Sequence, residues 1–141
     1  MYKNLFNTGL STSLLFLFCL LIVPASWAGE DLAQQTSREG KVTVKVTPLD
    51  LAAASVQWRF EIAFDTHVTA LDHDLLAIAA LDGGNGESAP IGWEGDAPGG
   101  HHRKGILTFK PLQPIPASVT LMIRQVGGVA ERHFNWPVVA P

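Results

Sequence analysis

Cysteine is nearly absent from this sequence. Its single cysteine, Cys19, lies in an apolar run near the N-terminus, so residues 29–141 contain none. That absence excludes disulfide bonds, thiolate metal sites and a cysteine nucleophile from this part of the chain. A metal ion bound there would need imidazole, carboxylate, methionine or backbone ligands.

An excess of positive charge is also lacking. The 141 residues include 10 lysines and arginines against 13 aspartates and glutamates, which gives a net charge of −3 with histidine neutral. Domains that bind phosphate backbones normally show a basic excess or a basic stripe. We therefore expect no nucleic-acid partner.

Catalytic motifs are missing as well. The sequence contains neither G-x-S-x-G nor H-E-x-x-H, and the acids of "DGGNGE" are too few for an EF-hand-type calcium loop. We therefore predict a protein that is not an enzyme. A hydrolase that combines Ser88, Asp96 and His101 is the third alternative, because a catalytic triad is recognised by geometry rather than by spacing.

The N-terminus has the layout of a secretory signal peptide. Lys3 gives a positive start, and residues 10–23 form an apolar run that is short for a membrane-spanning helix. Ser26 and Ala28 then supply small residues before a cleavage point. We predict a signal peptide over residues 1–28, a periplasmic or secreted protein, and no membrane span after cleavage.

The predicted mature chain divides into an arm and one domain. Residues 29–39 are polar and lack periodicity, so we expect a flexible arm. Residues 40–141 are long enough to bury a modest core without disulfide bonds. We therefore predict a single domain over this range.

Alternation of apolar and polar residues dominates the domain. Residues 41–47, "KVTVKVT", alternate throughout, and Pro48 is expected to end that strand. In residues 55–64, "SVQWRFEIAF", five apolar side chains share one face: Val56, Trp58, Phe60, Ile62 and Phe64. This pattern is typical of a strand with one buried face, and Trp58 is the predicted core tryptophan.

Further strand-like segments follow at regular spacing. "DLLAIAAL", residues 74–81, is apolar on both faces and is compatible with a strand or a short helix. Gly127 and Gly128 lie between two β-rich segments, as in a two-residue hairpin. Other strands are expected in residues 89–93, 104–110, 118–126 and 130–138, the last with Arg132, Phe134 and Trp136 on one face. About seven strands and no convincing helix predict an all-β protein, an immunoglobulin-like antiparallel β-sandwich.

Histidines supply the candidate metal ligands. The segments "FDTHVTALDHD" and "GGHHR" place His67, His101 and His102 in or beside loops, and loops at one end of a sandwich can converge. Neutral imidazole is a common ligand of transition metals. We predict that His67, His101 and His102 bind a copper or zinc ion.

Two other interpretations of "GGHHRKG" stay open. Glycine N–H groups together with Arg103 and Lys104 are compatible with an anion cradle. A hairpin loop with basic residues is the simpler interpretation, because anion loops normally open a helix. Trp93 and Trp136 are compatible either with an aromatic contact surface or with packing at the ends of the sandwich.

Three segments, "FDTHVTALDHDLLAIAALDGG", "WEGDAPGGHHRKGILTF" and "LMIRQVGGVAERHFNW", resemble small exported bacterial domains of the immunoglobulin-like β-sandwich type. The resemblance implies this fold and no particular activity. A small exported sandwich with loop histidines is also similar in kind to periplasmic copper-resistance carrier proteins. Those typically begin with a histidine at the mature N-terminus, whereas this chain would begin at Gly29, so their site is not carried over.

These observations favour two classes of function. The first is an exported, non-catalytic domain that binds a ligand, with copper or zinc as the specific case. The alternative is a periplasmic accessory domain that contacts a protein partner through a sheet edge or through the loop after Trp93, without a ligand.

Overall fold

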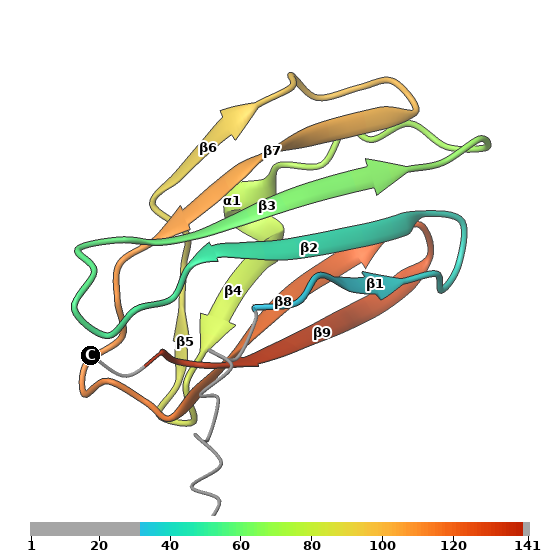
Figure 1. The fold of residues 1–141 in the computed structure, drawn as a ribbon. Coiled ribbons are helices and arrows are strands. Elements are labelled where there is room, and N and C mark those ends of the chain that lie inside the picture. The colour runs from blue at the N-terminus through green and yellow to red at the C-terminus, as the bar shows by residue number, and fades with distance from the viewer. Residues whose placement is uncertain (1–31, 140–141) are drawn as a thin grey trace, which may run out of the picture.

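Two antiparallel β-sheets, packed face to face, make up most of the described chain (Figure 1). The structure, a computed structural model, describes residues 32–139. The predicted signal peptide and its cleavage after Ala28 lie outside these residues and stay predictions. None of the helices within residues 32–139 is long and apolar enough to cross a membrane.

The larger sheet has five strands in the order β1-β2-β3-β7-β6, and the smaller sheet has four in the order β5-β4-β8-β9. Every neighbouring pair is antiparallel. The elements, in chain order, are β1 (Gln35–Ser37), β2 (Thr43–Asp50), β3 (Trp58–Asp65), α1 (Leu75–Ile78), β4 (Ala79–Asp82), β5 (Glu87–Ser88), β6 (Gly92–Gly95), β7 (His102–Phe109), β8 (Ser118–Val126) and β9 (Val129–Pro137).

The prediction of an all-β chain is confirmed. The described residues form nine strands where about seven were expected. The two additional strands are β1 and β5, which have three and two residues. Strands of that length are too short to show a period-two pattern, so the sequence gives no signal for them.

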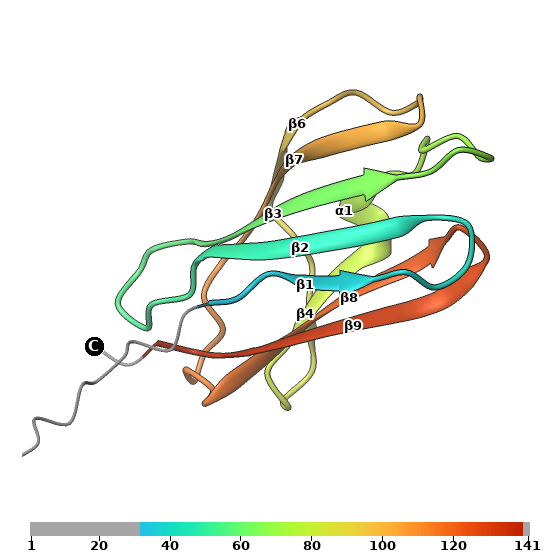
Figure 2. The same ribbon diagram turned by 45° about the vertical axis from the view of Figure 1, so that its right-hand side comes forward.

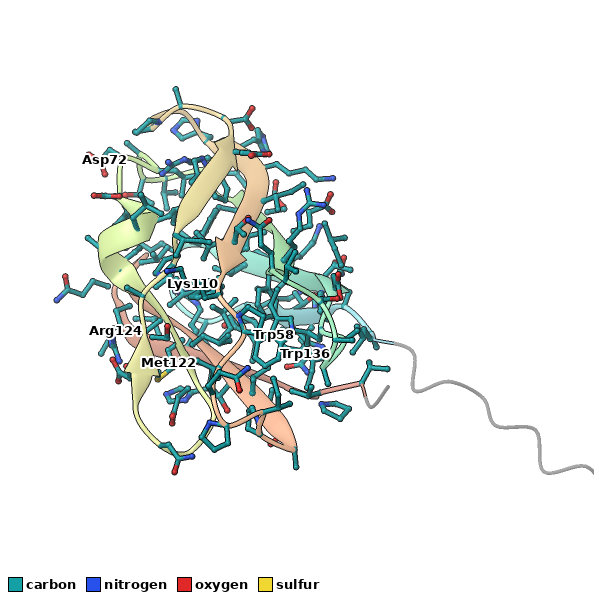
Figure 3. All side chains as sticks on the ribbon, turned by 90° about the vertical axis from the view of Figure 1, so that its left-hand side faces the viewer. Trp58, Asp72, Lys110, Met122, Arg124 and Trp136 are labelled. Atoms are coloured by element: carbon teal, nitrogen blue, oxygen red, sulfur yellow. The ribbon has the colours of Figure 1, made fainter. Side chains whose placement is uncertain are left out.

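The core lies between the sheets and is built from alternate residues of the long strands. In β3 the side chains of Trp58, Phe60, Ile62 and Phe64 are all buried, as the alternation predicts. Trp58 is completely buried, and its indole Nε1 donates to the carbonyl of Ala52 at 2.9 Å. Trp58 and Trp136 both lie in this interior (Figure 3).

Two details of the strand predictions are wrong. Val56 was expected on the buried face but is 89% exposed, because β3 begins only at Trp58 and Val56 lies in the preceding bend. Pro48 was expected to end its strand, yet β2 continues to Asp50. The register of β2 against β3 shifts between Pro48 and Asp50, and such an irregularity accommodates a residue that cannot donate a ladder hydrogen bond.

The ambiguous segment "DLLAIAAL" forms both of the structures that it allowed. Residues Leu75–Ile78 form α1, and Ala79–Asp82 form the central strand β4. The helix begins after Asp74, whose Oδ1 accepts a hydrogen bond from the backbone N–H of Leu76 at 3.0 Å. An aspartate at this position satisfies an N–H group that a short helix cannot pair internally.

The β8–β9 hairpin follows its prediction. Gly127 and Gly128 have φ angles of 64° and 82°, a conformation that suits glycine and joins twisted strands closely. In β9 the side chains of Arg132, Phe134 and Trp136 are buried. The core interpretation of Trp136 is therefore correct.

The segment predicted as a flexible arm contains an ordered strand. Residues Gln35–Ser37 form β1, which pairs with β2 and lies between β2 and β9 (Figure 2). The side-chain amide of Gln35 accepts from the backbone N–H of Asn135 at 3.1 Å and donates to the carbonyl of the same residue. The indole of Trp136 donates to the carbonyl of Ala33 at 2.7 Å. Polar side chains and backbone groups, rather than apolar periodicity, hold this segment in place.

Candidate functional site

The strands β3 and β7 bring residues from both histidine-containing segments to one end of the larger sheet. Asp65, the last residue of β3, lies opposite His102, the first residue of β7. The Nδ1 atom of His102 is 2.7 Å from Oδ1 of Asp65. Lys45 of β2 places its Nζ atom 3.5 Å from Oδ2 of the same carboxylate.

The charge state of Asp65 determines which ring nitrogen of His102 carries the hydrogen in the neutral imidazole. The hydrogen bond from His102 holds the pKa of the Asp65 carboxyl below its ordinary value of 3.8; partial burial opposes this effect, and the charge of Lys45 reinforces it. The carboxylate is therefore ionised at neutral pH and can only accept a hydrogen bond. Since Nδ1 of His102 must donate, the neutral ring carries its free lone pair on Nε2.

His67 is the second imidazole at this end. Its ring centroid is 6.4 Å from that of His102, and the two ring planes are nearly perpendicular. A surface depression of about 260 Å³ adjoins His67, Asp65 and the chain around Lys41. The hydroxyl of Thr66 anchors this loop by donating to the carbonyl of Lys41 at 2.7 Å. His67 itself is exposed and makes no side-chain hydrogen bond or ion pair with the described residues.

The third predicted ligand, His101, is exposed and makes no side-chain hydrogen bond or ion pair with the described residues. Its backbone is fixed, because its carbonyl accepts from the N–H of Thr66 at 2.9 Å. Within residues 32–139, no three side chains of the types His, Cys, Asp and Glu come together in a group that could hold a metal ion. The structure thus brings the His67 and His102 rings near each other, but the predicted set of three histidines does not form a metal-binding group within the described residues.

The other two histidines lie away from this pair. Nε2 of His73 is 3.0 Å from the carbonyl oxygen of Gln125. Nε2 of His133 is 2.7 Å from Oε1 of Glu131, on the smaller sheet. Neither approaches the end of β3, so the candidate site consists of His67 and His102 with the Asp65 carboxylate.

The loop backbone at this end is tied together by hydrogen bonds. Leu71 donates its N–H to the carbonyl of Gly100 at 3.1 Å, and Gly99 donates to the carbonyl of Leu71 at 2.9 Å. The N–H of Lys104 is bound by Oδ2 of Asp96 at 2.8 Å. The N–H groups of Gly99 and Lys104 in "GGHHRKG" therefore already have partners inside the protein, which argues against an anion cradle there.

Arg103 also does not have the orientation expected in an anion cradle, where its guanidinium would face the solvent. The residue is only 4% exposed, and its guanidinium donates to the carbonyls of Leu71, His73 and Asp96. Burial lowers the pKa of this guanidinium, whereas the charges of Asp74 and Asp96 act in the opposite sense. Arg103 therefore holds the loop that follows β3 against the end of the sandwich.

A cleft opens beside Arg103, between α1 and β6. Its volume is about 320 Å³, and Asp72, Asp74, Leu76 and Trp93 contribute to its walls. The ring of Trp93 lies under Arg103, with the guanidinium carbon 5.3 Å from the ring centroid. Its indole Nε1 donates to the carbonyl of Asp96 at 3.1 Å. The sequence carries no local signal for this cleft, because the residues of its walls come from three separate segments.

Gly105 makes room for the Trp93 indole. A β-carbon at Gly105 would lie 2.6 Å from Cζ2 of Trp93 and 2.6 Å from the carbonyl oxygen of Glu94. Any larger residue would push Trp93 out of its position or separate β6 from β7. The only sequence signal for this contact is a glycine within an otherwise regular strand.

The triad considered from the sequence is not assembled. Ser88 belongs to β5 in the smaller sheet, whereas Asp96 and His101 lie in the connection between β6 and β7, at the opposite end of the molecule (Figure 1). No family model, no curated protein and no solved structure matches this chain. The resemblance to exported bacterial domains therefore stays a prediction.

Proposed function

We propose that this protein is an exported, non-catalytic binding domain of the immunoglobulin-like type, periplasmic or secreted, that holds a copper(II) or zinc(II) ion. The proposed site lies where β3 ends and β7 begins, with His67 and His102 as ligands. One observation carries the proposal: the Asp65 carboxylate binds Nδ1 of His102 at 2.7 Å while a second exposed imidazole lies beside it.

The chemistry of this pair suits a metal ion. Metal-bound histidines commonly donate their second ring N–H to a carboxylate, which orients the ring and raises its basicity. Asp65 provides that carboxylate, and Nε2 of His102 is left to bind the ion. Metal–nitrogen distances of about 2.0–2.1 Å place two bound imidazole centroids roughly 5–6 Å apart, and the observed 6.4 Å lies slightly above that range.

Two imidazoles leave further coordination positions for water or another ligand. His101 is the remaining candidate from the predicted set, because it directly precedes His102 and is exposed. A site with few protein ligands on an open surface exchanges its ion readily. That property suits a domain that takes up and releases a metal, and not one that uses the metal to fold.

Calorimetric titration of the exported product, purified without a histidine tag, tests the proposal. Copper(II) and zinc(II) should each bind with a stoichiometry of one, and His67→Ala or His102→Ala should weaken binding by about tenfold or more. Binding should also weaken from about pH 7.5 to about pH 5.5, because protons compete for the imidazoles. His133→Ala is the matched control, and His101→Ala tests the third position. Equal binding by the wild type and the His67→Ala/His102→Ala double variant would refute the proposal.

A second candidate function is a protein-interaction domain that needs no metal. The cleft between α1 and β6 favours it, because Trp93 and the 42% exposed Leu76 contribute apolar surface to an open depression. The adjoining strand β6 is an edge of the larger sheet. This second function predicts a partner for that surface whatever the outcome of the metal titration.

A further inference from the structure

The cleft between α1 and β6 has an apolar floor. Leu76 of α1, Trp93 of β6 and Pro98 of the following loop all contribute to it. Trp93 is held in place by its hydrogen bond to Asp96 and by the approach of Gly105 behind it. The cleft is therefore a formed surface feature, with a volume of about 320 Å³.

Its rim is acidic. Asp72 and Asp74 both line the cleft, and the Asp72 side chain is 76% exposed at the edge of the molecule above α1 (Figure 3). One carboxylate oxygen of Asp74 accepts a hydrogen bond from the backbone N–H of Leu76 at the start of α1. His73 lies between them, with its Nδ1 atom 4.0 Å from Asp72.

Arg103 adds one positive charge to a cleft lining that carries two carboxylates, so the lining keeps one net negative charge. Arg103 is buried, and its Nε and Nη1 atoms donate to backbone carbonyls. Its charge faces Asp96 as well as Asp74. The exposed rim therefore presents two carboxylates to solvent above an apolar floor.

From this arrangement we infer that the cleft is a docking site for a lysine or arginine side chain of a partner protein. The aliphatic stem of such a side chain covers Leu76, Trp93 and Pro98, while its charged end reaches Asp72 and Asp74. Long basic side chains combine an apolar stem with a charged end, and carboxylates beside an aromatic ring suit them. This inference rests on the second candidate function and names the chemistry of its partner.

The test uses the ¹⁵N-labelled exported protein and two short peptides, Ac-GLKLG-NH2 and Ac-GLELG-NH2. Only the lysine peptide should shift the signals of the Trp93 indole N–H and the Leu76 amide. The Asp72→Asn/Asp74→Asn double variant should bind it about fivefold more weakly, in line with the loss of two exposed ion pairs. Asparagine caps helices as well as aspartate, so this variant keeps α1 and removes only the charges.

Asp82→Asn is the matched control, because Asp82 caps the turn after β4 and lies outside the cleft. It should bind the lysine peptide like the wild type. Equal shifts with both peptides, unchanged affinity in the double variant, or no shift at millimolar lysine peptide would each overturn the inference. The metal titration does not depend on these results. If the lysine peptide does not bind but a protein partner binds at the edge strand β6, the inference is wrong and the second candidate function is retained.

Discussion

Arg132 of β9 donates hydrogen bonds to the backbone carbonyls of Val126 and Val42, at 2.7 and 3.1 Å, and so joins the smaller sheet to the chain that enters β2. Arg132 is 2% exposed, and the same guanidinium also donates to the carbonyl of Glu39 and the hydroxyl of Ser37. It therefore satisfies two buried carbonyls, those of Val126 and Val42.

Replacement of Arg132 should destabilise the fold strongly. Arg132→Met keeps the aliphatic stem but removes the donor from two buried carbonyls, those of Val126 and Val42, and each such group costs about 1–3 kcal/mol. We expect the free energy of unfolding to fall by about 3 kcal/mol or more in urea titrations. Arg38→Met, at an exposed position, should change it by less than about 0.5 kcal/mol. Similar losses in the two variants would show that burial of the guanidinium is not what matters.

Trp58 should be the most costly core position in β3. Trp58→Ala removes a completely buried indole and should lower the free energy of unfolding by about 3–5 kcal/mol. Val56→Ala, two residues earlier, changes an exposed side chain and should have an effect within about 0.5 kcal/mol. Arg59→Ala, on the outer face, should also have little effect. Comparable losses at Val56 and Trp58 would contradict a strand that begins at Trp58.

Glu131 should make a pH-dependent contribution to stability. The hydrogen bond from Arg124 holds the pKa of its carboxyl below the ordinary 4.5, against a smaller effect of burial. A depressed carboxyl pKa adds stability that is complete above the unfolded value and is lost as the pH falls through the folded value. The stability difference between wild type and Glu131→Gln should therefore shrink below about pH 4.5. An NMR titration of the Glu131 carboxyl with a midpoint at or above 4.5 would contradict this, and Glu94→Gln serves as the control.

Gln35 should protect the edge of β9. Its side-chain amide makes two hydrogen bonds to the backbone of Asn135, so Gln35→Ala should speed hydrogen exchange at the Asn135 amide. The loss in the free energy of unfolding should be about 1–2 kcal/mol. Gln34→Ala, next to it and exposed, should leave that exchange rate unchanged. Unaltered exchange in Gln35→Ala would mean that β1 protects this edge by other contacts.

Asp65 should influence metal affinity without being a ligand. In Asp65→Ala both imidazoles remain, but the ring of His102 loses the acceptor for its Nδ1 proton. We expect copper(II) or zinc(II) to bind about 10- to 100-fold more weakly, with the stoichiometry unchanged. Calorimetry measures both quantities. Affinity equal to that of the wild type would exclude Asp65 as the orienting group.

The sequence predicts the long strands well because each carries its own evidence. The alternation in β3 and β9 follows directly from burial on one face, and the two glycines of the β8–β9 hairpin predict the turn. By contrast, β1 depends on a glutamine whose partner, Asn135, lies one hundred residues away. No local pattern reports such a contact.

The candidate site is predictable only in part, for the same reason. The sequence predicts that His67 and His102 lie in or beside loops near the ends of strands. It does not predict that β3 pairs with β7, which brings the two histidines together. The orientation of Arg103 was also missed. Arg103, Gly105 and Leu107 are each two residues apart in β7 and therefore lie on the same, inner face of the strand. The charge of Arg103 nevertheless favoured an exposed interpretation.

The hydrogen bonds that tie the loop after β3 to the loop before β7 have an entropic consequence. Thr66 and Leu71 of the first loop bind His101 and Gly100 of the second, so the backbone at this end is ordered when the chain folds. Loops ordered beforehand lose little further conformational freedom when something binds to them. A ligand that arrives here meets a rigid frame on which only side-chain rotamers remain to be chosen, and proteases should cut this end no faster than the strands themselves.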